Sequence, residues 1–223
     1  MFVGHLALGF AAKRVTPRVS LAVLLTASQV ADVLWPIFLA LGLEQVRIEP
    51  GNTAFTPLDF VSYPWSHSLV MLVVWGVVLG AIYRLATGRN GRVFIVLAVL
   101  VVSHWLLDWI THRPDMPIYP GGAKYGLGMW NLVTLTMVVE GIMFAVGLWI
   151  YVSTTRARDA IGRWGFAGLI ALLVLVYAAN ATASPPPSVN AIVVAASIGI
   201  VIMTAWSWWA DHHRDVILSA GQP

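Results

Sequence analysis

The chain has 223 residues, of which 59% are hydrophobic and only 10% are charged, with a formal net charge of +3 at pH 7. Soluble domains carry roughly a quarter charged residues, so this composition excludes a water-soluble domain and predicts an integral membrane protein. The absence of cysteine excludes disulfides and thiolate metal sites. The basic residues lie mainly in short connections between apolar stretches, which indicates orientation in a bilayer and no nucleic-acid partner.

The order of apolar stretches predicts a polytopic bundle. Met1–Ala12 is apolar but too short to cross a bilayer, and we expect a half-inserted or re-entrant helix there. Six longer stretches have about the 20 residues that a spanning helix needs: Leu21–Leu43, Trp65–Leu85, Val93–Thr111, Trp130–Tyr151, Trp164–Ala181 and Val189–Ala210. We predict one all-α membrane domain over 1–223, with a functional core at 1–153 and a C-terminal packing hairpin at 160–210.

The distribution of Lys and Arg predicts the orientation of these spans. Basic residues gather at Lys13–Arg18, Arg84–Arg92 and Arg156–Arg163, in every second connection. Connections rich in Lys and Arg stay in the cytoplasm. We therefore expect these three connections and both termini to be cytoplasmic, and the other connections to face outward.

Ionisable side chains interrupt the apolar stretches at Asp32, His104, Asp108 and Glu140. A charged group at the bilayer centre costs about 2.5–3.5 kcal/mol or more, so each needs a partner. His104 and Asp108 are four residues apart and share a helix face, and imidazole and carboxylate are natural ligands of a divalent metal. A rise of ~1.5 Å per residue places six such side chains in the outer half of the bilayer: His5, Asp32, His67, His104, Asp108 and Glu140.

Each of these residues has a structural alternative, because intramembrane His and Asp also join helices by hydrogen bonds. We favour function for Asp32, and a metal site or a proton relay for the pair His104 and Asp108. Gln29 lies one turn before Asp32 and is expected to orient its carboxylate. Pro36 is expected to kink this helix.

Four further residues are weighed in the same way. Glu140 needs a partner, and a metal or a histidine would serve. His112 lies near the outer end of its helix, where it is either a ligand of the site or a side chain that faces water. His212 and His213 lie on the cytoplasmic side and are expected to be solvated.

These residues and their order resemble the LexA-binding, inner-membrane-associated family of membrane-bound metal-dependent hydrolases. The resemblance covers residues 1–115, with a related variant at 126–140. It is carried by four short motifs: Gly4-His5-Leu6-Ala7-Leu8-Gly9, Gln29-Val30-Ala31-Asp32, His67-Ser68 and Ser103-His104-Trp105-Leu106-Leu107-Asp108. The chain departs from the family at Ser62–Ser68, which lacks the first His and the Arg of a His-Arg-X-X-His-Ser pattern.

The resemblance implies a bacterial inner-membrane protein that hydrolyses a phosphoester, since the family has been likened to zinc-dependent phospholipases C. It implies one or two divalent ions, zinc first, with five metal ligands: His5, Asp32, His67, His104 and Asp108. Such ions lower the pKa of bound water, and Asp108 or Glu140 is expected to act as general base. From their place in the outer loop, we expect Arg113 and Lys124 to hold the phosphate of a lipid or lipid-linked substrate at the outer leaflet, and Asn131 either to contact that substrate or to cap the helix that follows.

Other classes of function remain open on the sequence. Proton-coupled carriers also use intramembrane His, Asp and Glu, although no inverted repeat is visible. A scaffold could use the same residues as hydrogen-bonding contacts between helices. An intramembrane zinc protease requires His-Glu-X-X-His, which is absent. Whether LexA or another protein binds is not indicated by any residue.

Overall fold

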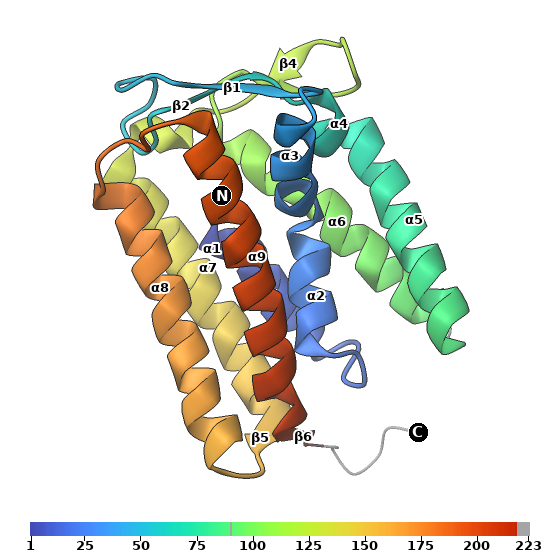
Figure 1. The fold of residues 1–223 in the computed structure, drawn as a ribbon. Helices are drawn as coiled ribbons and strands as arrows, with labels where there is room; N and C mark the ends of the chain where they lie inside the picture. Colours follow the sequence, from blue (N-terminus) through green and yellow to red (C-terminus); the bar gives the residue numbers. More distant parts are fainter. Residues whose placement is uncertain (90, 218–223) are drawn as a thin grey trace.

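Long apolar helices run between the two ends of the molecule in the computed structural model, which describes residues 1–89 and 91–217 (Figure 1). Five helices among these residues are long and apolar enough to cross a membrane. Their sides expose large apolar side chains, as lipid contact requires. The predicted α-helical membrane protein is confirmed. The five are α5 (Leu69–Thr87), α6 (Gly91–Thr111), α7 (Val133–Thr154), α8 (Phe166–Thr182, continuing the turn η2 at Ile161–Gly165) and α9 (Val189–His212).

The first predicted span is broken into two helices. α2 (Leu21–Ser28) and α3 (Val30–Ala40) meet at Gln29 with a bend of 62°. The pair counts as a sixth span if it is taken as one. The expectation of one continuous helix was wrong: the bend lies at Gln29, whereas Pro36, where a kink was expected, lies inside α3. The break occurs at Gln29, whose amide bonds back to Thr26 O at 3.1 Å in a tighter turn.

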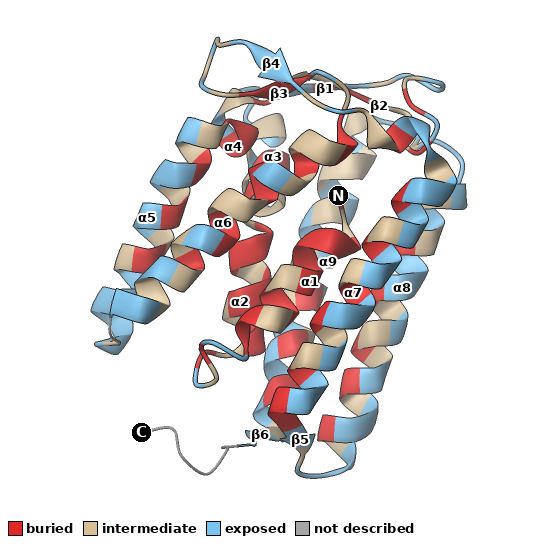
Figure 2. Ribbon diagram, turned by 180° about the vertical axis from the view of Figure 1, so that it is seen from behind, coloured by how far each residue is buried: buried red, intermediate tan, exposed pale blue. Residues whose placement is uncertain are grey.

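The short helix α1 (Val3–Ala12) lies in the interior of the bundle, packed mainly on α7 and α2. Eight of its ten residues are buried, as Figure 2 shows by colour. Small residues permit this close approach: Gly147 of α7 faces the backbone of Ala7, and Gly9 faces the backbone of Leu24 and Leu25. The prediction of a short helix is confirmed, and the start of α1 is enclosed by the bundle.

The two ends of the molecule differ in their connections (Figure 1). The three basic connections, α1–α2, α5–α6 and α7–α8, lie toward one end of the molecule, which also carries the ribbon of β5 (Thr155–Ala157) and β6 (Arg214–Val216). The opposite end is covered by residues 44–68 and 113–131, which we call the cap. It contains β1 (Gln45–Ile48) paired with β2 (Leu58–Ser62), α4 (Pro64–His67), β3 (Met116–Pro117) paired with β4 (Lys124–Tyr125), and the turn η1 (Met129–Asn131).

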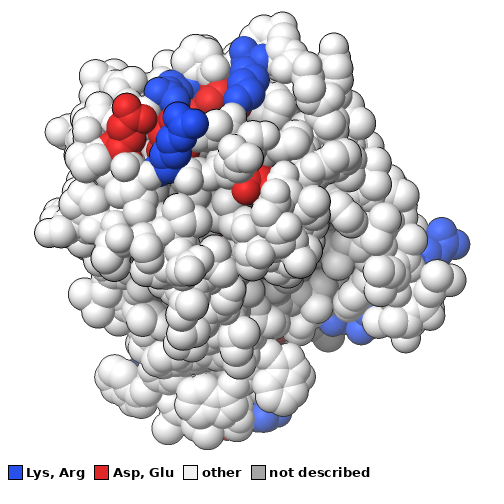
Figure 3. All heavy atoms as spheres, turned by 45° about the horizontal axis from the view of Figure 1, so that its top comes forward, with Lys and Arg blue, Asp and Glu red and all other residues white. Residues whose placement is uncertain are grey.

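Charged side chains on the face drawn in Figure 3 gather mainly at the cap, and most of the bundle below it is uncharged. The alternation of connections between the two ends agrees with the predicted topology. Which end faces the cytoplasm stays a prediction. The charged residues of the cap are Glu44, Arg47, Glu49, Asp59, Arg113, Asp115 and Lys124.

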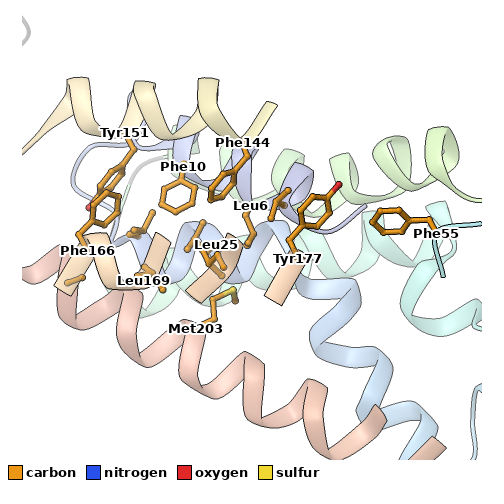
Figure 4. Packing of buried hydrophobic residues seen from close by; sticks show 14 of the residues in the cluster. Leu6, Phe10, Leu25, Phe55, Phe144, Tyr151, Phe166, Leu169, Tyr177 and Met203 are labelled. Carbon is orange, nitrogen blue, oxygen red and sulfur yellow. The ribbon is translucent and has the colours of Figure 1, made fainter. Parts of the chain in front are cut away.

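An apolar core joins α1 to the C-terminal helices. Phe10 of α1 makes edge contacts with Phe144 and Tyr151 of α7 and with Phe166 at the start of α8 (Figure 4). Within a bilayer such contacts stabilise the bundle by close van der Waals packing, because lipid chains are themselves apolar. α9 packs on α2 and α3, so the predicted C-terminal hairpin encloses α1 and both halves of the broken helix.

Candidate metal centre

The five residues expected to bind a metal lie together where the cap meets the bundle. Two groups of three have ligand atoms that all lie within 4.8 Å of one another. One group is His5, His104 and Asp108, and the other is Asp32, His67 and His104. They come from α1, α3, α4 and α6, so four separate helices contribute. The protein therefore contains His/Asp groups that could hold a metal ion, as expected from the sequence.

Asp108 is at the centre of this arrangement and is buried, with 2% of its surface exposed. Its Oδ1 lies 2.9 Å from Nε2 of His5, and its Oδ2 lies 3.1 Å from Nε2 of His104 and 3.9 Å from Nε2 of His67. Asp32 lies 3.6 Å from His67 and 3.9 Å from His104 on the other side. Two ligand atoms of one tetrahedral zinc ion are about 3.3 Å apart, so these separations suit a shared ion.

The broken helix fixes the orientation of His104. The bend at Gln29 frees the carbonyl of Ser28, which accepts a hydrogen bond of 2.9 Å from Nδ1 of His104. Nδ1 must carry the proton, because a carbonyl only accepts. Nε2 of a neutral ring is then an acceptor, and it is buried with no hydrogen-bond partner within the described part of the chain. It faces a carboxylate oxygen of Asp108, so a cation would satisfy both atoms.

A second chain of hydrogen bonds orients His67. The hydroxyl of Ser66 donates to Oε2 of Glu44 at 2.7 Å and lies 2.6 Å from Nδ1 of His67. The hydroxyl proton is used toward Glu44, so Nδ1 of His67 is the donor to Ser66. Nε2 of His67 is again left without a proton in the neutral ring, and it points toward Asp32 and Asp108. Metal-binding histidines have this second-shell pattern.

His5 completes the group from the central helix. Its ring stacks on that of His104 with centroids 3.6 Å apart and planes 5° apart. Its Nδ1 is buried without a hydrogen-bond partner among residues 1–89 and 91–217. The amino group of Met1 also contacts Oδ1 of Asp108, and it lies 3.2 Å from Oγ1 of Thr111. Oδ2 of Asp108 faces Nε2 of His67 and His104 instead.

Glu140 holds the beginning of α1. Its Oε2 accepts from the amides of Phe2 at 2.8 Å and Gly4 at 3.2 Å. A carboxylate at a helix N-terminus is stabilised by free amides and by the helix dipole. Its Oε1 is fully buried and has no partner among the described residues. Glu140 thereby positions the helix that carries His5, and its role as general base stays a prediction.

The centre opens on the side of Asp32. The side chain of Asp32 is 37% exposed, whereas those of the other four residues are no more than 3% exposed. Gln29 was expected to orient Asp32, but its Oε1 is buried without a hydrogen-bond partner in the described chain. The opening beside Asp32 is the side from which a ligand can reach the centre.

The three residues predicted to contact substrate all lie in the cap. Arg113 forms an ion pair with Asp59 and lies 3.4 Å from Asp115, so its charge is already compensated. Lys124 donates to the carbonyl of Val61 at 2.9 Å and borders a surface hollow. Asn131 is exposed and donates to Gly128 O at 3.3 Å. Their contacts with a substrate stay predictions.

The cap also encloses His112, which is 3% exposed. The alternative of a water-facing histidine is therefore wrong. Its Nδ1 lies 3.0 Å from Asp115 Oδ1, which also accepts from the hydroxyl of Tyr63 at 2.6 Å. Burial, and next the charge of Asp115, raise the pKa of Tyr63 well above its usual range, so this phenol stays a donor. His212 and His213 lie at the far end, beside Trp208 O and Asp159.

Comparison of the chain with protein-family models, with curated proteins and with solved structures yields no match. The function must therefore be argued from the geometry of the centre itself.

Proposed function

We propose that the protein is a membrane-embedded, metal-dependent hydrolase that cleaves a phosphoester of a lipid or lipid-linked substrate. The observation that carries the proposal is the direction of the imidazoles. His67 and His104 each commit Nδ1 to an outer partner and turn Nε2 toward the carboxylates of Asp32 and Asp108. Oδ1 of Asp108 is already contacted by the amino group of Met1 and by Nε2 of His5. Its Oδ2 faces Nε2 of His104, which has no hydrogen-bond partner in the described part of the chain, and burying these two acceptors without a cation or a further proton between them is costly in a low-dielectric interior.

A ligand set of imidazole nitrogens and carboxylate oxygens favours zinc, and manganese and related ions also bind such ligands. A divalent ion held by His5, His104 and Asp108, or by Asp32, His67 and His104, would polarise a phosphoryl oxygen and activate water. The residues of the chain hold the site dry on all sides but that of Asp32. Of the two expected bases, Glu140 keeps a buried oxygen, Oε1, free of partners in the described residues.

The position of the centre supports a lipid substrate. His67 belongs to α4 in the cap, so the centre lies close to one end of the spanning helices (Figure 1). That end is the outer one if the basic connections are cytoplasmic. The headgroup of a lipid would then lie at the level of the centre. Lys124 and the hollow lined by Ser62, Tyr63 and Gly122 lie in the cap at the same end.

The proposal is tested with the detergent-purified chain and mixed micelles of phospholipid or polyprenyl phosphate. We expect release of phosphate or a soluble phosphorylated headgroup, loss of this activity with a chelator, and recovery with zinc. Asp108→Asn and His104→Ala should be inactive, whereas His212→Ala, at the far end, should retain full activity. Turnover that persists in Asp108→Asn, or a metal-loaded protein without turnover of any phosphoester, would contradict the assignment. Uptake driven by a pH gradient in liposomes would instead support a carrier.

A further inference from the structure

His112 has the geometry of a metal ligand, although it was not among the five expected. It follows Asp108 by four residues, directly after the end of α6 at Thr111, and its Nε2 lies 3.8 Å from Asp108 Oδ2. Its Nδ1 is 3.0 Å from a carboxylate oxygen of Asp115, which only accepts. The neutral ring therefore turns an unprotonated Nε2 inward, as His67 and His104 do. Two nitrogen or oxygen ligands of one tetrahedral zinc ion lie about 3.3 Å apart, so Nε2 of His112 and Oδ2 of Asp108 would approach by about half an ångström on binding a shared ion.

The ring of His112 is held firmly in this direction. It packs on Trp130 with centroids 4.1 Å apart and on Phe60 at 4.9 Å. The end of α6 is fixed by the amide of Gly128, which donates to His112 O at 2.7 Å. A side chain at Gly126 would overlap the carbonyls of His112 and Arg113, so this loop can lie against the helix only with glycine there. Such packing is the preorganisation that a ligand requires.

The two groups of three ligands described above share His104, so they contain one nitrogen ligand too few for each group to bind its own ion. Both include His104, but its Nδ1 is committed to Ser28 O, so only Nε2 is free. One nitrogen lone pair binds one ion. Asp108, in contrast, has two oxygens: Oδ1 lies near His5, and Oδ2 lies near His67, His104 and His112. A further imidazole beside Asp108 would supply the missing ligand.

We propose that His112 is a sixth metal ligand and that the centre binds two ions which share the carboxylate of Asp108. This inference rests on the proposed metal centre and specifies it as a two-ion site, the kind that clamps both oxygens of a phosphoester in displacement. Asp115 is the positioning residue for His112, because its carboxylate holds the ring with Nε2 inward.

Metal stoichiometry tests the inference without any assay of activity. The full chain in detergent is stripped with a chelator, dialysed against buffered zinc and analysed for zinc per chain. We expect two ions in the wild type and in His212→Ala, and one ion in His112→Ala and in His112→Gln, which keeps a polar group beside Asp115. Two ions in a folded His112→Gln, or a single ion in the wild type, would overturn the inference and leave the proposed hydrolase standing. A wild type that binds no ion would overturn both.

A second variant keeps the test decisive if changes at His112 prevent folding. Asp115→Asn keeps the volume of the side chain but removes the charge that orients the ring. Loss of a second-shell partner costs about 10–100-fold in metal affinity. We expect Asp115→Asn to weaken one of the two zinc sites by this factor and to leave the other unchanged. Equal affinities in Asp115→Asn and the wild type would refute a ligand role for His112.

Discussion

The carboxylate of Glu44 and the hydroxyl of Ser66 form a hydrogen bond of 2.7 Å inside the cap. Glu44 also accepts from the amides of Trp65 and Ser66, each at 2.8 Å. One carboxylate thus fixes the first turn of α4 and, through the Ser66 hydroxyl, the ring of His67. Glu44 is therefore a positioning residue for the centre: it acts on His67 through Ser66.

Removal of this support should weaken metal binding without removing a ligand. We expect Glu44→Gln and Ser66→Ala to lower zinc affinity by about 10–100-fold, because His67 loses the partner that keeps Nε2 inward. Competition with a chromophoric chelator measures the affinity. Glu49→Gln changes an exposed acid of the same cap and should have no effect. Affinity that is unchanged in both Glu44 and Ser66 variants would show that His67 is oriented by other means.

Close packing of α1 on α7 should depend on the glycine at 147. A methyl group added to Gly147 would overlap the backbone of Ala7, whereas one added to Gly141 of the same helix meets no atom within 4 Å. Overpacking costs about 1–3 kcal/mol, so Gly147→Ala should lower the free energy of unfolding in detergent by that amount. Gly141→Ala, the matched control, should leave it unchanged or raise it. Equal stability of the two variants would contradict the packing described for α1.

A buried ion pair holds the basic end of the bundle together. Nζ of Lys13 lies 2.7 Å from Asp211 Oδ2, and Asp211 also accepts from the amide of Leu21 and from the hydroxyl of Tyr151. Removing one partner of a buried pair costs about 3–5 kcal/mol, because the other charge is stranded. We expect Asp211→Ala to lose this much stability, and Lys13→Met with Asp211→Ala together to lose less than the sum of the single changes. Additive losses in denaturant unfolding would show that the two groups do not interact.

The same end of the molecule carries a pH-dependent contact. The hydrogen bond from His213, at 2.6 Å, and next the amide of Gly162 lower the pKa of Asp159 below its ordinary value of 3.8. A lowered folded-state pKa stabilises the protein above the unfolded value, and this contribution is lost as the pH falls through the folded value. Wild type should therefore unfold at a higher temperature than Asp159→Asn at pH 6, by a small margin since the group is exposed. The margin should begin to shrink near pH 3.8 and vanish below the lowered folded-state pKa; a margin that stays constant as the pH falls from 6 into the acid range would contradict the assignment.

Much of this architecture follows from hydropathy and from helical spacing. Apolar stretches of about 20 residues located the spans, and the four-residue separation placed His104 and Asp108 on one face of α6. The rise per residue placed Asp32 at the depth of His104, and the structure places it beside His67 and His104.

Other features left no signal that a single sequence can show. The break at Gln29 depends on one residue in an apolar helix, and the carbonyl of Ser28 that it frees has no side-chain signature. Glu44 lies 22 residues before Ser66 in a connection without hydrophobic periodicity. In the sequence it is therefore indistinguishable from any other charged loop residue. Strands of two to five residues, such as β3, are too short for an alternating pattern to appear.

The shared cation is tested most directly by elemental analysis of the detergent-purified chain beside Asp108→Asn, His104→Ala and the control His212→Ala. We predict stoichiometric zinc or another divalent metal in the wild type and in the control, and loss of this metal in both variants of the centre while they stay folded. A well-folded wild type that takes up no divalent ion, even after dialysis against zinc, would contradict this prediction.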